Sequence, residues 1–153
     1  MSEKKLNLVM VDDDVAIVRI VEHIVAQHLS DLFDIVTFAD SRAALEWVNE
    51  YGCDVLISDL EMPGVGGLDL LRAGKGRQAD TQTILLTAHS SWDRIAEAIE
   101  QGVNDYLLKP IDQAQLVELL RQKHRTLSRS AVAECELLDG SPVLECGELS
   151  PLG

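Results

Sequence analysis

The stretch Val55-Leu56-Ile57-Ser58-Asp59-Leu60-Glu61-Met62-Pro63-Gly64 decides how the rest of the chain is organised. Three apolar residues, two of them β-branched, lead into a single acid and are typical of a strand buried on both faces. Pro63 and Gly64 then favour a turn, because proline presets φ and glycine permits a positive φ. Asp59 is therefore predicted at the carboxyl end of a central strand, where open α/β sheets hold their ligands.

Length and composition narrow the class of protein. The 153 residues are enough for one domain with a buried core. The net charge of −13 argues against general nucleic-acid binding through a basic surface. Cys53, Cys135 and Cys146 have no metal or disulfide spacing, which favours a reducing compartment such as the cytoplasm. The apolar run 6–11 is short and ends in three acids, so neither an export signal nor a membrane span is expected.

Apolar runs alternate with segments of helical spacing along most of the chain. This order predicts five repeats of a strand and a helix, which form a parallel sheet with helices on both faces. We therefore expect a doubly wound five-stranded α/β fold, (βα)5, with the flavodoxin-like strand order 2-1-3-4-5. The expected strands are 6–11, 33–38, 55–59, 83–87 and 104–108.

Helix ends are predicted from capping residues and glycines. Asp14 and Ser41 are the expected N-caps of the first two helices, and Ser90 or Ser91 that of the fourth. The third helix is expected to be short and to end at about Arg72, because Gly74 and Gly76 follow.

The chain is expected to divide near Thr126. Residues 1–126 hold the periodic pattern and are predicted to form the folded domain. From residue 130 onward the sequence has two prolines, three glycines and five acids, without a basic residue or a clear period. Residues 127–153 are therefore interpreted as an acidic, flexible tail or the start of a linker.

Acids, a hydroxyl and a lysine are predicted to meet at one edge of the sheet. Asp12 and Asp13 follow the first strand, Asp59 ends the third, and Thr87 and Lys109 end the fourth and fifth. Converging carboxylates repel each other unless a cation lies between them, and hard oxygen ligands suit Mg²⁺. A carboxylate can also attack a phosphoryl group, whose oxygens would pair with a lysine and a hydroxyl. The edge is therefore predicted to be a phosphoryl-transfer site.

Four motifs of the chain resemble one family, the receiver domains of bacterial two-component response regulators, including the chemotaxis regulators. The resemblance covers residues 6–126, and the motifs occur in the family's order and spacing. It implies that Asp59 accepts a phosphoryl group from a sensor histidine kinase or a histidine phosphotransfer protein. The motifs are Val11-Asp12-Asp13, Asp59 with Met62-Pro63-Gly64, Leu86-Thr87-Ala88 and Leu108-Lys109-Pro110.

The resemblance also implies how Mg²⁺ is held. Asp13, Asp59 and the main-chain carbonyl of Glu61 would bind the ion directly, and Asp12 would help through water. Three carboxylates and one carbonyl are a ligand set that suits a hard cation.

Further roles follow from the same resemblance. Thr87 and Lys109 would be the phosphate partners, and Thr87 would act with Tyr106 as the conformational switch. Glu61 and His89 would tune the lifetime of the aspartyl phosphate. The resemblance also implies a cis peptide bond between Lys109 and Pro110.

The family resemblance sets the expected partners and activity. The switch would reshape the face formed by the helix through Ile95 and Ile99, the strand 104–108 and the last helix. A target, or a second copy of the chain in a homodimer, is expected there. The chain is expected to catalyse only its own phosphorylation and dephosphorylation, and to bind neither nucleic acid nor a membrane directly.

The sequence leaves two alternative functions open. Asp12-Asp13-Asp14-Val15 also fits the Asp-x-Asp-x-Val nucleophile motif of haloacid-dehalogenase-like phosphatases, with Asp12 as the nucleophile. Against that interpretation, no paired acids follow Lys109, and Asp59 would have no role. A pseudo-receiver that only binds a partner is the second alternative, and the complete set of site residues argues against it.

Overall fold

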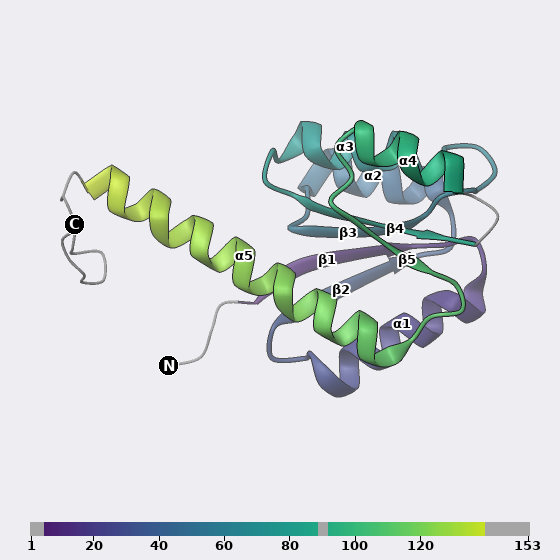
Figure 1. Ribbon diagram of the computed structural model, residues 1–153, viewed down its shortest axis with the longest axis horizontal. Coiled ribbons are helices and arrows are strands. Elements are labelled where there is room, and N and C mark those ends of the chain that lie inside the picture. Colours follow the sequence, from purple (N-terminus) through teal and green to yellow (C-terminus); the bar gives the residue numbers. More distant parts are fainter. Residues whose placement is uncertain (1–4, 89–91, 140–153) are drawn as a thin grey trace. The chain divides into compact units, whose positions relative to one another are not determined.

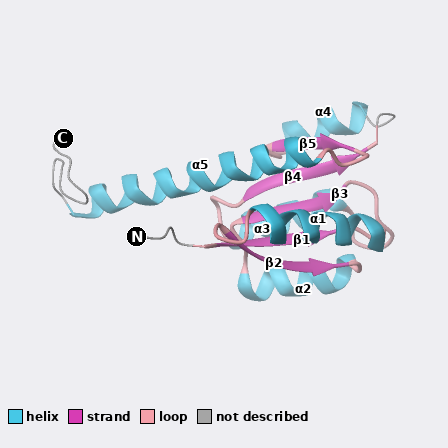
Figure 2. Ribbon diagram, turned by 90° about the horizontal axis from the view of Figure 1, so that it is seen from below, coloured by secondary structure: helices cyan, strands magenta, loops and turns pink. Residues whose placement is uncertain are grey.

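A computed structural model of the chain describes residues 5–88 and 92–139. The chain divides into two compact units, Met1–Arg121 and Gln122–Gly153. The first unit contains a five-stranded sheet in the order β2-β1-β3-β4-β5, in which every pairing is parallel. Figure 2 shows the strands running in one direction. The predicted doubly wound α/β fold and its strand order are confirmed.

The strands bring their carboxyl ends to a common edge. Val11 pairs with Ser58, Asp59 with Leu86, and Thr87 with Leu108 in the parallel register. The residues that follow β1 and β5 therefore lie at the same edge as the last residues of β3 and β4. The strand bounds are β1 Leu6–Val11, β2 Phe33–Phe38, β3 Val55–Asp59, β4 Gln82–Thr87 and β5 Asp105–Leu108.

Helices cover both faces of the sheet. Within the first unit, α1 and residues 113–121 of α5 lie on one face, whereas α2, α3 and α4 lie on the other (Figure 1). All five residues of β3 are buried, as expected for a central strand between two helical layers. The helix bounds are α1 Val15–His28, α2 Ser41–Tyr51, α3 Gly67–Arg77, α4 Trp92–Glu100 and α5 Gln113–Asp139.

The first two helices begin with aspartate caps. Asp14 caps α1, as predicted, and its carboxylate accepts a hydrogen bond from the Ala16 amide. For α2 the predicted cap was wrong by one residue, because the Asp40 carboxylate accepts from the Arg42 amide. Ser41 is instead the buried first residue of α2. The residues expected to cap α4, 90 and 91, lie outside the described part of the chain.

Helix α3 is longer than predicted, because it continues through Gly74 to Arg77. A Cβ atom at Gly74 would lie 3.1 Å from Leu56 Cδ2, so the absent side chain lets α3 approach β3 closely. Close packing against the sheet therefore outweighs the low helix propensity of glycine at this position.

Helix α5 also extends beyond the expected domain. It continues to Asp139, past both Thr126 and Arg129. The division of the chain near Thr126 stays a prediction. Among the described residues, no helix is both long enough and apolar enough to cross a bilayer.

Candidate functional site

Three carboxylates gather at the carboxyl edge of the sheet. Asp12 and Asp13 follow β1, and Asp59 is the last residue of β3. One carboxylate oxygen from each lies within 4.8 Å of the others. Asp12 is fully buried and Asp59 nearly so, whereas Asp13 is exposed. The predicted convergence of these acids is therefore present, with one member open to solvent.

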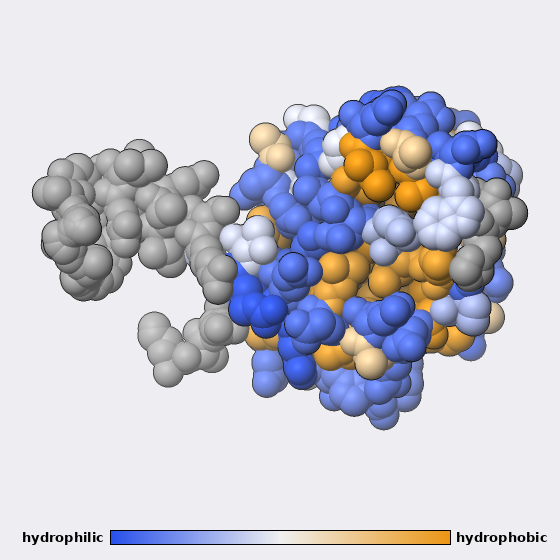
Figure 3. Space-filling model, in the orientation of Figure 1, coloured by the Kyte–Doolittle hydropathy of each residue, from blue (hydrophilic) through white to orange (hydrophobic). Residues whose placement is uncertain are grey.

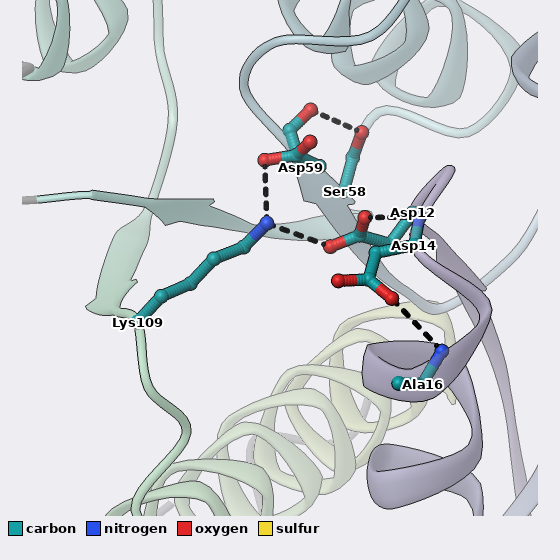
Figure 4. Close-up of polar contacts among 6 residues, drawn as sticks. All are labelled: Asp12, Asp14, Ala16, Ser58, Asp59 and Lys109. Atoms are coloured by element: carbon teal, nitrogen blue, oxygen red, sulfur yellow. Dashed lines mark hydrogen bonds and ion pairs between the residues drawn. The ribbon is translucent and has the colours of Figure 1, made fainter.

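Lys109 bridges two of these acids (Figure 4). Its Nζ atom lies 2.9 Å from Asp12 Oδ2 and 3.1 Å from Asp59 Oδ1. The Asp14 amide donates to the other oxygen of Asp12 at 2.9 Å. Asp12 Oδ2 is buried, and the Lys109 ammonium is its ion-pair partner. The lysine neutralises part of the charge and leaves Oδ2 able to accept a further ligand.

Burial and mutual repulsion shift the acid–base behaviour of the site. Burial raises the pKa of Asp59, and the nearby charge of Asp12 raises it further, while Lys109 opposes both effects. Burial by itself would lower the pKa of Lys109, but hydrogen bonds and charge attraction from Asp12 and Asp59 outweigh it and raise this pKa. The site therefore holds a charged lysine and a carboxylate whose ionisation is disfavoured until more positive charge arrives.

The predicted switch residues lie beside the acids and on β5. Thr87 ends β4 and is buried, and its hydroxyl donates to the Ala88 carbonyl at 3.3 Å rather than to the acids. Tyr106 is half-buried on β5, and its ring meets that of Trp92 edge to face, with centroids 6.1 Å apart. Trp92 begins α4, so an aromatic contact joins β5 to that helix.

Glu61 is the predicted ligand and lifetime residue that follows Asp59. Its side chain is exposed and pairs with Arg94 on α4. His89, the second predicted lifetime residue, lies outside the described residues. The Lys109–Pro110 bond is cis, as the resemblance implied.

The sequence interpretation missed the residues that hold the β3–α3 loop. The Ser41 hydroxyl donates to the Pro63 carbonyl at 3.2 Å. A Cβ atom at Gly67 would overlap the main-chain carbonyl oxygen of Asp59, so only glycine lets α3 begin this close to the site. Arg94 reaches the loop from α4. These contacts join distant parts of the sequence, and no local motif indicates them.

The donor set fits a hard divalent cation. The three carboxylates repel one another, and among the described residues Lys109 contacts two of them, Asp12 and Asp59. Oxygen ligands with one side open to water are the coordination that Mg²⁺ prefers. Asp13, exposed at the rim, provides such an open side.

The chain belongs to the response regulator receiver domain family, which its sequence matches over residues 8–121. It is thus a receiver domain of the kind found in two-component response regulators, as the motifs implied. Receiver domains are signalling domains rather than metabolic enzymes, so the phosphatase alternative is not favoured. Receiver domains of response regulators interact with histidine kinases or phosphotransfer proteins.

Known relatives show the same family and fold. The DNA-binding transcriptional regulator NtrC of Escherichia coli K12 is 37% identical over 113 residues, which are 74% of this chain and 24% of NtrC. The receiver domain of AraT from Geobacillus stearothermophilus is 26% identical, with a TM-score of 0.76 over 84% of this chain and 99% of that one. The chemotaxis protein CheY4 of Vibrio cholerae is 26% identical, with a TM-score of 0.69 over 78% of this chain and 98% of that one.

The chain thus spans about a quarter of the length of the NtrC relative. NtrC is a DNA-binding regulator by name, and that property belongs to the longer protein.

Proposed function

We propose that Asp59 is the phosphoacceptor and that it takes a phosphoryl group from a sensor histidine kinase or a histidine phosphotransfer protein. The observation that carries this proposal is the geometry around Asp59: it ends a buried strand, lies within 4.8 Å of two other carboxylates, and contacts Lys109 at 3.1 Å. Asp12 is a poorer nucleophile, because it is fully buried and engaged by both Lys109 and the Asp14 amide.

Mg²⁺ is the cofactor that the acids would hold. Asp13, Asp59 and the Glu61 carbonyl are the proposed direct ligands, with Asp12 acting through water. When bound, the ion would neutralise the carboxylates and the phosphoryl oxygens. The support for this assignment is the cluster of three acids and the family's usual chemistry.

The transfer itself is performed by Asp59. Its carboxylate oxygen attacks phosphorus and forms an O–P bond, while the N–P bond to the donor imidazole breaks and that imidazole keeps the electron pair. Lys109 moves from pairing the carboxylates to pairing a phosphoryl oxygen. The Thr87 hydroxyl, now on the Ala88 carbonyl, turns to donate to a second phosphoryl oxygen. The chain acts in this way only on its own aspartate.

The signal passes through α4. When the Thr87 hydroxyl turns inward, Tyr106 gains space and the Tyr106–Trp92 contact changes, which moves the start of α4. Apolar surface is exposed where β5 lies beside α4 and residues 113–121 of α5 (Figure 3). Trp92 and Ile99 on α4 are each about half exposed. This α4–β5–α5 face is the proposed docking site for a target or for a second copy of the chain.

The charge and the family of the chain bear on its partners and its location. The net charge of −13 supports a receiver that does not itself bind nucleic acid or an acidic membrane surface. Membership of the family supports work in the cytoplasm.

Intact-mass analysis after incubation with acetyl phosphate tests the proposal. We expect one phosphoryl group on the wild-type protein with Mg²⁺ and none with a chelator. Asp59→Asn should take none, whereas Asp34→Asn, which alters an exposed acid on β2, should label as wild type does. Equal labelling of wild type and Asp59→Asn would overturn the assignment.

A further inference from the structure

Helix α4 is held by few buried side chains. Of Trp92–Glu100, Ile95 and Ala98 are buried. Polar side chains reach across to α4 at both of its ends. Arg94 pairs with Glu61 near the start of α4, and Arg72 of α3 hydrogen-bonds Gln101 just beyond its end. A helix with so small a buried face depends more on such contacts than one anchored in the core does.

The Arg94–Glu61 pair joins α4 to the loop that leaves Asp59. Arg94 Nη1 lies 2.5 Å from Glu61 Oε2, and about half of each side chain is exposed. Beside the pair is an open cleft lined by Leu60, Met62, Pro63 and Gly66. The guanidinium thus lies over the loop that carries the proposed carbonyl ligand.

The main chain of this loop is held from other directions. The Leu60 amide donates to the Leu86 carbonyl at 2.9 Å, and the Ser41 hydroxyl donates to the Pro63 carbonyl. The Glu61 side chain makes a polar contact between this loop and Arg94 of α4. The loop after Asp59 is therefore held firmly by its own main-chain contacts. The Arg94–Glu61 ion pair links it to α4, which is held less firmly.

We propose that Arg94 is a positioning residue for the chemistry of Asp59: by holding the Glu61 carboxylate toward α4, it couples the position of α4 to the lifetime of the aspartyl phosphate. This inference rests on the proposed function of Asp59. While the pair is formed, Arg94 engages the Glu61 carboxylate and neutralises its charge. When α4 shifts, the pair breaks and the carboxylate becomes free two residues from Asp59.

The freed carboxylate speeds hydrolysis. A water oxygen forms a bond to phosphorus, the P–O bond to Asp59 breaks, and Asp59 keeps the electron pair as its carboxylate. Glu61 accepts the proton that the water loses, and inorganic phosphate leaves. Arg94 thereby delays this step for as long as it holds Glu61. Because exposed ion pairs are weak, the expected effects reach about five-fold at most.

A double-mutant cycle tests the proposal on the full chain. The cycle compares the wild-type protein with Arg94→Gln, Glu61→Gln and the double variant. The control is Lys5→Gln, which breaks the similarly exposed Lys5–Asp34 pair far from α4 in the sequence. The first readout is hydrogen exchange of the α4 amides without a phosphodonor. The second is the decay of the aspartyl phosphate made with acetyl phosphate and Mg²⁺.

We expect hydrogen exchange of the α4 amides to be two- to five-fold faster than wild type in each single variant. The double variant should exchange at the same rate as the single variants, and Lys5→Gln at the wild-type rate. We also expect Arg94→Gln to lose its phosphoryl group at least about two-fold faster than wild type, and to have no such effect when Glu61→Gln is present.

Unchanged exchange in both single variants would overturn the link between Arg94 and α4. Faster exchange with unchanged decay would overturn the role in chemistry. If the wild-type protein takes no phosphoryl group, the proposed function of Asp59 fails, and the proposed coupling to its chemistry fails with it. The hydrogen-exchange measurement still decides whether the Arg94–Glu61 pair holds α4.

Discussion

Keeping the Asp59 carboxylate ionised in the folded chain costs free energy. Burial raises its pKa, Asp12 adds to the shift, and Lys109 offsets only part of it. A carboxyl with a raised folded-state pKa stabilises the fold while protonated, and this contribution is lost as the pH rises through that pKa. At neutral pH without Mg²⁺, the ionised Asp59 therefore lowers the stability of the native state.

Asp59→Asn is accordingly expected to raise the melting temperature at pH 7 without Mg²⁺. A relief of about 1 kcal/mol corresponds to about 2–4 °C for a chain of this size. The gain should shrink as the pH falls through the raised folded-state pKa of Asp59 and should be absent below the unfolded-state pKa of about 3.9. It should also shrink when Mg²⁺ binds the wild type. Thermal melts at several pH values, with Asp34→Asn as the control, measure it. A lower melting temperature for Asp59→Asn at pH 7 would contradict this account of the site.

Some residues of the site could be predicted from the sequence alone, and others could not. Asp12, Asp59 and Lys109 could be placed together, because each follows or ends a strand and parallel strands end at one edge. Arg94 could not, because it lies on an exposed helical turn and meets Glu61 only after α4 folds onto the sheet. The Gly67 contact with the Asp59 carbonyl is likewise visible only in three dimensions.

At the scale of elements, two glycines of α3 should respond differently to alanine. Gly76 is exposed, and a Cβ added there would meet nothing within 4 Å, so Gly76→Ala should stabilise the fold by about 0.5–1 kcal/mol through helix propensity. Gly74 is buried, and an added Cβ would meet Leu56 Cδ2 at 3.1 Å. Overpacking costs about 1–3 kcal/mol, so Gly74→Ala should be no more stable than wild type.

Urea unfolding of the two variants gives the comparison. The midpoint should rise for Gly76→Ala and stay level or fall for Gly74→Ala, with the same slope in both. An equal rise would show that α3 does not pack closely against β3 at Gly74.

Strands were easier to predict than helix ends. Each strand is a short apolar run with turn residues around it, and the expected bounds agree with the structure to within one residue. Asp40 and Ser41 are both good capping residues, so sequence alone left the start of α2 uncertain by one position. The length of α3 depends on Gly74 packing against Leu56, a tertiary contact that overrides local propensity.

At the scale of the whole molecule, the proposed function requires that a phosphoryl group on Asp59 change α4. Trp92 reports on this change because it begins α4 and contacts Tyr106, whereas Trp47 packs between Phe38 and Tyr51 on the β2–α2 side. Beryllofluoride with Mg²⁺, which stands in for the phosphoryl group, should shift Trp92 emission in a Trp47→Phe protein.

Two controls accompany this emission measurement. Adding Asp59→Asn should abolish the shift, and Mg²⁺ alone should give a smaller one. Constant Trp92 emission, while calorimetry shows beryllofluoride binding at Asp59, would mean that the signal does not pass through the start of α4.

The central claim is that Asp59, rather than Asp12, carries the phosphoryl group. The most direct measurement is to label the wild-type protein with acetyl phosphate and Mg²⁺, reduce the acyl phosphate with borohydride to a stable alcohol, and locate the altered residue by tandem mass spectrometry. We predict the alteration at Asp59 alone, and its loss when Mg²⁺ is chelated. An alteration at Asp12, or at any residue other than Asp59, would contradict the account.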